Sequence, residues 1–125
     1  MIDQQGTTNW TKAHFVCYVF LCVADSDLNI EETELEELKR ALQATLEDEF
    51  DFGVIIRDVI SEVGMQTYEE KKQFITANKS RFLSNQAEAT KVMDGIEEII
   101  MADMSIDPDE MEVYRFLKKQ LITNF

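Results

Sequence analysis

Residues that form tight turns are scarce in this chain, and this scarcity restricts its possible folds more than any other feature. The sequence contains one proline and four glycines in 125 residues. Sheets built from hairpins need many such residues at their turns, whereas long helices need few. Hydrophobic residues make up 45% of the chain, enough for one domain of this length to bury a core. The sequence therefore predicts an all-α fold, a single-domain bundle of about six helices.

Apolar side chains recur at three- and four-residue steps along most of the chain, which is the periodicity of helices. Residues 13–24 are apolar at nearly every position and predict a helix that is buried on most sides and begins at Asn9 or Thr11. Thr67 and Glu70 have the spacing of a capping box, and Pro108 is typical of the first residue of a helix. The predicted organisation is one helical hairpin over about 10–47, connecting helices over about 51–83, and a second hairpin over about 85–123.

The chain is strongly acidic, with a formal charge of -13 from 25 acidic and 12 basic residues. A surface of this charge repels nucleic acid phosphates and anionic lipid headgroups. It favours cations or a basic protein partner, although an acidic surface also serves solubility alone. The run from Glu31 to Glu37 accordingly has two interpretations, a solvated helix face or a docking surface for a basic protein. We expect no nucleic acid partner.

The apolar run 13–24 bears on localisation, because it is the only segment that resembles a membrane or targeting sequence. It is too short to span a bilayer, so we expect no membrane span. Cys17 and Cys22 lie within it, on different faces of the predicted helix, and this spacing predicts buried thiols without a local disulfide. His14 adds no CxxC-type metal site to them, so all three are interpreted as core or boundary residues. Reduced thiols are typical of the cytoplasm, which is the expected location.

One short pattern, Asp-x-x-Ile-x-x-x-Glu, occurs twice in the chain at an offset of 76 positions. The first copy runs from Asp27 to Glu34 and the second from Asp103 to Glu110. Each copy follows an apolar helix pattern and precedes an amphipathic one, which predicts two related helix–loop–helix hairpins. Each Glu then lies in the first turn of the outgoing helix, where it can accept hydrogen bonds from free backbone N–H groups.

This arrangement resembles the TerB family, named for a tellurite-resistance protein, and the related domain of DjlA-type cochaperones. The resemblance covers nearly the whole chain. It implies a compact helical fold with internal pseudo-twofold symmetry, a link to bacterial stress or tellurite resistance, and acidic positions that bind metal. In this sequence those positions are Asp27, Glu34, Asp103 and Glu110. The chain departs from the family at Leu28 and Met104, where glycine is common, so an ion-binding turn that needs left-handed backbone is not supported there.

The four motif carboxylates have two interpretations. Each motif lies at the corner between the two helices of its hairpin. If these two interhelical corners meet, the carboxylates form an oxygen-only site suited to Ca²⁺ or Mg²⁺. If they lie apart, each one caps a helix, and the domain is structural or serves protein interaction. The chain has one histidine and lacks phosphate-loop and nucleophile motifs, so we expect no enzyme activity. The sequence thus predicts a non-enzymatic binding module, either a monomer or a homodimer.

Overall fold

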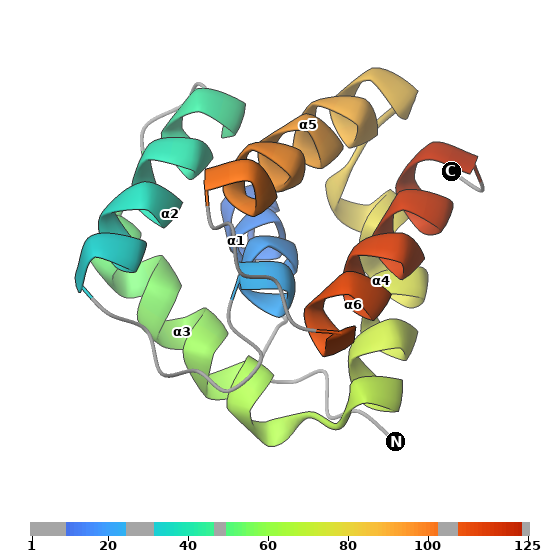
Figure 1. Ribbon diagram of the computed structural model, residues 1–125, viewed down its shortest axis with the longest axis horizontal. Helices are drawn as coiled ribbons and strands as arrows, with labels where there is room; N and C mark the ends of the chain where they lie inside the picture. Colours follow the sequence, from blue (N-terminus) through green and yellow to red (C-terminus); the bar gives the residue numbers. More distant parts are fainter. Residues whose placement is uncertain (1–9, 25–31, 47–49, 103–107, 124–125) are drawn as a thin grey trace.

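The fold is all-α, as the sequence predicts. The computed structural model describes residues 10–24, 32–46, 50–102 and 108–123, and within these ranges it contains helices and no strand. The helices form a single bundle (Figure 1). They are α1 (Lys12–Ala24), α2 (Glu32–Leu46), α3 (Phe52–Met65), α4 (Tyr68–Phe82), α5 (Gln86–Ala102) and α6 (Pro108–Lys118), which continues into a π-helical turn, η2 (Lys119–Thr123).

The centre of the bundle is α1, which packs against each of the other five helices. The side chains from Phe15 to Phe20 have no exposed surface, so the helix is buried on all sides. This confirms the expectation from the nearly continuous apolar run. Full burial of one large apolar side chain contributes about 1.5–3 kcal/mol, so the burial of these α1 side chains contributes strongly to the stability of the fold.

Although α1 is strongly apolar, it has only 13 residues, fewer than the roughly 20 that a membrane-spanning helix needs. No helix in the described part of the chain is both long and apolar enough to cross a membrane. The predicted absence of a membrane span therefore agrees with the described helices.

Aromatic contacts attach α4 to α1 and to Trp10, which precedes α1. The ring centroids of Trp10 and Tyr18 lie 5.6 and 4.7 Å from that of Phe74, and Phe15 stacks on Phe82 at 5.1 Å. Each aromatic pair of this kind adds about 0.5–1.5 kcal/mol beyond the burial of its area. These contacts hold α4 against the central helix.

The outer helices bury one face each, as their sequence periodicity predicts. The residues buried on these faces are Leu38, Leu42 and Leu46 of α2, Val92, Met93 and Ile96 of α5, and Val113 and Leu117 of α6. Between them, side chains such as Glu36, Lys39 and Glu112 are exposed. This alternation orients each outer helix with its apolar stripe toward α1.

Local signals in the sequence mark two helix starts correctly. The predicted capping box is present in α4, where the Thr67 and Glu70 side chains each accept a hydrogen bond from the other's backbone N–H. Pro108 is the first residue of α6, as expected from its fixed φ and missing N–H.

The last described turn differs from what the sequence predicts. Apolar residues at Met111, Tyr114, Leu117 and Leu121 indicate one regular helix through Leu121, whereas the structure has the wider turn of η2. Side-chain donors from two other helices reach the carbonyls of this turn. Gln86 Nε2 donates to Leu121 O at 2.8 Å, and Lys79 Nζ donates to Gln120 O at 3.2 Å. Such donors satisfy carbonyls at the end of a helix, which stabilises a geometry that regular α-helices avoid.

Candidate functional site

The structure places two of the four predicted metal ligands on helices. Glu34 is the third residue of α2 and Glu110 is the third residue of α6, although their side chains lie outside the described residues. Asp27 and Asp103 lie outside the described ranges altogether. Among the described residues, no group of three or more His, Cys, Asp or Glu side chains forms a metal site. The convergence of the four motif carboxylates therefore stays a prediction.

The third residue of a helix has a defined role at two other helix starts in this molecule. Glu70, the third residue of α4, accepts from the Thr67 backbone N–H at 2.9 Å. Glu88, the third residue of α5, accepts from the Ser84 N–H at 2.7 Å. The Thr67 hydrogen bonds lower the pKa of the Glu70 carboxyl. The contact with Lys12 and the Ser84 N–H likewise lower the pKa of the Glu88 carboxyl. Carboxylates at this helix position thus act as ionised caps.

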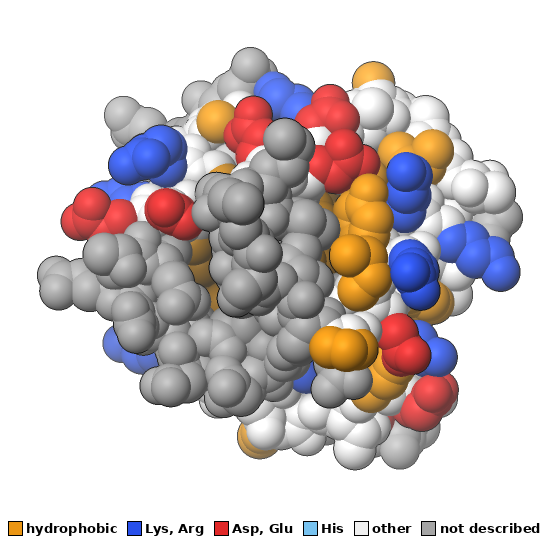
Figure 2. All heavy atoms as spheres, in the orientation of Figure 1, with side chains coloured by type: hydrophobic (Ala, Val, Ile, Leu, Met, Phe, Trp, Pro, Cys, Tyr) orange, Lys and Arg blue, Asp and Glu red, His pale blue; other side chains and the backbone are white. Residues whose placement is uncertain are grey.

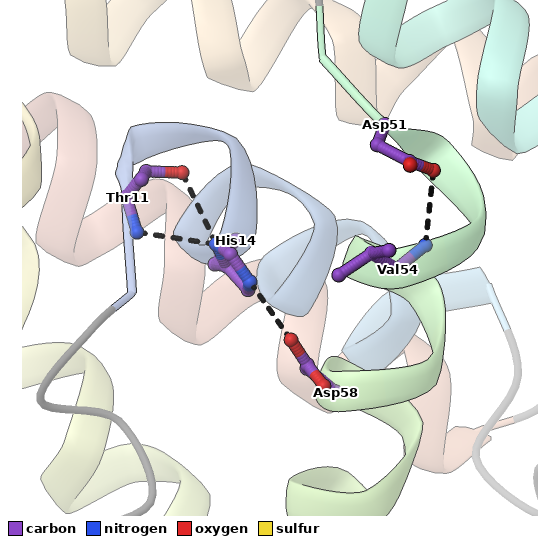
Figure 3. A network of polar contacts seen from close by, with 5 residues as sticks. All are labelled: Thr11, His14, Asp51, Val54 and Asp58. Atoms are coloured by element: carbon purple, nitrogen blue, oxygen red, sulfur yellow. Dashed lines mark hydrogen bonds and ion pairs between the residues drawn. The ribbon is translucent and has the colours of Figure 1, made fainter.

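The histidine at the corresponding position of α1 joins that helix to α3. The Thr11 backbone N–H donates to His14 Nδ1 at 3.1 Å. Because a backbone N–H can only donate, Nδ1 is the acceptor and the neutral ring carries its proton on Nε2. Nε2 lies 3.3 Å from Asp58 Oδ2 on α3 and donates to it (Figure 3). The Trp10 ring stacks on His14 with centroids 5.4 Å apart. These contacts confirm His14 as a boundary residue, and both of its ring nitrogens are hydrogen-bonded within the protein.

The two cysteines have the properties of core residues. Both thiols are free, and the side chains of Cys17 and Cys22 are 0% and 2% exposed. Burial raises the pKa of the Cys17 thiol, and burial also raises the pKa of Cys22 to about 12. Thiols with raised pKa values stay protonated and are poor nucleophiles and metal ligands. The prediction that Cys17 and Cys22 are buried thiols without a local disulfide is confirmed.

An apolar pocket of about 450 Å³ opens between the first turn of α1, the end of α2 and the start of α3. Its volume lies within the range of about 300–1,000 Å³ that is usual for ligand pockets. The apolar side chains of its wall are Ala13, Leu46, Phe50, Val54 and Ile55. The pocket opens to the surface at Val54, which is 41% exposed. Figure 3 shows Val54 on α3 directed toward His14 on α1.

The polar residues around this pocket already have partners within the protein. Lys12 Nζ pairs with the Glu88 carboxylate. Asp51 Oδ1 accepts from the Val54 N–H at 3.2 Å and is the N-cap of α3 (Figure 3). The ring nitrogens of His14 contact Thr11 and Asp58 as described above. What the pocket offers to a ligand is therefore mainly its apolar wall.

The sequence alone gives little sign of this pocket, because its wall comes from three helices that are brought together only by the fold. Its one local signal is Phe50, an aromatic residue isolated in the acidic segment 47–51. The pattern predicts a helix break there, which is correct, but it does not predict that Phe50 and Leu46 face a shared hollow.

Acidic side chains gather on more than one part of the surface. Glu36 and Glu37, at the end of the predicted acidic run, are exposed on α2, as expected for a solvated helix face. Figure 2 shows a second group of acidic side chains over α5, where Asp94 and Glu98 are exposed. The described surface thus has the acidic character that the composition predicts.

No protein family, no curated protein and no solved structure matches this sequence. The assignment to a TerB-like family therefore stays a prediction.

Proposed function

We propose that this chain is a non-enzymatic binding module that holds a divalent cation, Ca²⁺ or Mg²⁺, at two acidic interhelical corners. The proposed ligands are Asp27 and Glu34 in the first corner and Asp103 and Glu110 in the second. The observation that carries this proposal is the recurrence of the motif together with its placement, since Glu34 and Glu110 are the third residues of their helices. The expected role in bacterial stress or tellurite resistance rests on the TerB resemblance alone.

The packing of the hairpins supports a common origin for the two corners. The helix before the first corner, α1, packs against α6, and the helix before the second corner, α5, packs against α2. A twofold rotation that places the first hairpin on the second maps α1 onto α5 and α2 onto α6. Such a rotation therefore maps the contact between α1 and α6 onto the contact between α5 and α2. Lys12 and Glu88, which are in contact, are also 76 positions apart, the same offset as between the two motifs. In a twofold arrangement, equivalent residues contact each other only beside the axis.

The chemistry of the proposed ligands suits a hard cation. Carboxylate oxygens are the usual protein ligands of Ca²⁺ and Mg²⁺. Four carboxylates that share a small volume repel each other, and a divalent ion neutralises part of that charge. The net charge of -13 raises the local concentration of cations around the chain.

A structural role for the same carboxylates is the second candidate, and the helix starts of α4 and α5 favour it. Glu70 and Glu88 occupy the third position of their helices and act as caps. Glu34 and Glu110 occupy that position in α2 and α6. On this alternative the motif stabilises two interhelical corners, and the domain serves as a scaffold or an interaction surface.

Replacement of Glu by Gln separates the two candidates. Glutamine fills the capping position as glutamate does, but it lacks the charge that an ion requires. The test is calorimetric titration of metal-stripped protein with Ca²⁺ and with Mg²⁺ at physiological salt. The variants are Glu34→Gln and Glu110→Gln, and the matched control is Glu70→Gln, which changes the third residue of α4 in the same way.

We expect saturable binding to the wild type and to Glu70→Gln, and binding at least about tenfold weaker, or about 1.4 kcal/mol, to the two motif variants. An ion at a hundred times its dissociation constant should also stabilise the wild type by about 2.7 kcal/mol. The absence of heat and of any shift in unfolding temperature with millimolar ion would reject the ion site in favour of the capping role.

A further inference from the structure

We infer that the apolar pocket between α1, α2 and α3 is a docking site for a basic amphipathic helix of a partner protein. This inference does not depend on the proposed ion site, because it uses none of the four motif carboxylates. It rests on the apolar wall of the pocket, on the hydrogen bonds and the ion pair that the polar lining residues already make, and on the charge of the neighbouring sequence.

The wall of the pocket is apolar and accessible at the surface. Leu46, Phe50 and Val54 contribute from the end of α2 and the start of α3. Among the described residues, Val54 is one of the few large apolar side chains that are exposed, at 41%. A partly open apolar hollow of about 450 Å³ can accept anchor side chains from one face of an amphipathic helix.

The polar groups around the pocket leave no strong recognition group for an anion. The Lys12 ammonium pairs with Glu88, and His14 contacts Thr11 and Asp58. A ligand carboxylate or phosphate would have to displace one of these contacts. Apolar side chains meet no such competition.

The charge of the surrounding chain selects for a basic partner. Five of the lining residues belong to the segment 46–58, which ends at Asp58, the hydrogen-bond partner of His14. This segment contains five acidic residues and one arginine, a formal charge of -4. Leu46 and Phe50 are joined in the sequence by three consecutive acidic residues. A partner helix with Lys or Arg beside its apolar face would be attracted to a segment of this charge, and a partner with Asp or Glu there would be repelled.

The single tryptophan provides a direct signal for binding. Trp10 stacks on His14, which lines the pocket, so a ligand in the pocket lies one side chain away from the indole. The probe is a synthetic helix of about 15 residues, a length at which isolated helices are marginally stable, with Leu on one face and Lys on the other. A matched peptide carries Glu in place of Lys.

The decisive variants are Val54→Arg and Met65→Arg, both in α3. Val54 lines the pocket, whereas Met65 is 70% exposed near the other end of the helix and is not part of the pocket wall. The two substitutions make the same change in net charge, so they separate docking in the pocket from general attraction to an acidic protein.

We expect a saturable change in Trp10 fluorescence with the Leu–Lys peptide, at least about tenfold weaker binding to Val54→Arg, and less than about twofold change for Met65→Arg. Higher salt should weaken the binding, and the Leu–Glu peptide should not bind. Equal effects of the two substitutions, equal binding of the Leu–Glu peptide, or no saturation would overturn the inference. Sedimentation that shows Val54→Arg abolishing self-association would also overturn it, since the occupant would then be a second copy of the chain.

Discussion

Gly95, in the middle of α5, is a position where the packing of this fold can be tested against helix propensity. A Cβ atom at Gly95 would lie 2.7 Å from Phe20 Cζ of α1 and 2.7 Å from Thr45 Oγ1 of α2. Normal carbon contacts are about 3.5–4.0 Å, so both neighbours would have to move by roughly 1 Å. Phe20 has no exposed surface and Thr45 is buried, so neither has free space into which to move. The absence of a side chain is thus what allows α5 to approach α1 and α2 this closely.

The expected change in the free energy of unfolding caused by Gly95→Ala follows from two opposing effects. Replacement of glycine by alanine inside a helix gains about 1 kcal/mol from propensity and the entropy of the unfolded chain. Overpacking of a well-packed core costs about 1–3 kcal/mol. We therefore expect Gly95→Ala to destabilise the protein by a net of up to about 2 kcal/mol, which corresponds to a decrease of up to about 8 °C in unfolding temperature.

The assay is urea and thermal unfolding followed by far-ultraviolet circular dichroism, with Gly53→Ala as the matched control. A Cβ at Gly53 in the first turn of α3 would meet only Asp51 Oδ1, at the ordinary distance of 3.6 Å. We expect Gly53→Ala to be neutral or stabilising by about 0.5 kcal/mol. Phe20→Leu removes the ring that the added methyl group would contact, so the loss caused by Gly95→Ala should be smaller in that background. If Gly95→Ala stabilised the protein as Gly53→Ala does, the close approach of α5 would be refuted.

Two further predictions concern the charged and reactive groups. Because the pKa of Glu88 is lowered in the folded protein, its ionised form stabilises the fold above about pH 4.5, and this contribution is lost as the pH falls through the folded pKa. In urea titrations, the wild type should therefore be more stable than Glu88→Gln near neutral pH and should lose this advantage as the pH falls below 4.5 and through the folded pKa. In a Lys12→Met background this pH-dependent advantage should be smaller. Because Cys17 and Cys22 are buried and their pKa values are raised, a thiol reagent should label neither in the native protein and both in denaturant. Thr76→Cys, at an exposed position of α4, serves as the positive control, and rapid native labelling of the wild type would contradict the prediction.

The helices could be predicted from the sequence because their signals are local. The apolar period of α2, the Thr67 and Glu70 box and the proline of α6 each act within a few residues. The central position of α1 was also predictable, because a run with almost no polar face can be stable only when it is surrounded.

Contacts between distant residues could not be predicted in this way. His14 and Asp58 are 44 positions apart, and nothing in either local sequence selects the other. The pocket has the same origin, since Ala13, Leu46 and Val54 come from three helices whose relative placement depends on the whole core. In the sequence, Gly95 indicates only a position of low helix propensity. The position of Phe20 in the fold shows why this position has no side chain.

The burial of α1 also restricts where this protein can bind anything. Side chains from Phe15 to Phe20 contact only the core, so ligands can approach the central helix only at its ends. The pocket proposed for docking lies at the first turn of α1, and the first proposed ion corner follows the last residue of α1, Ala24, in the sequence. A helix of 13 residues at 1.5 Å per residue separates its two ends by about 20 Å. This exceeds the Debye length of about 8 Å at physiological salt, so charge at one end is largely screened from the other. The two binding proposals are therefore independent. If the ion titration showed no binding, the peptide experiment would still test the docking pocket.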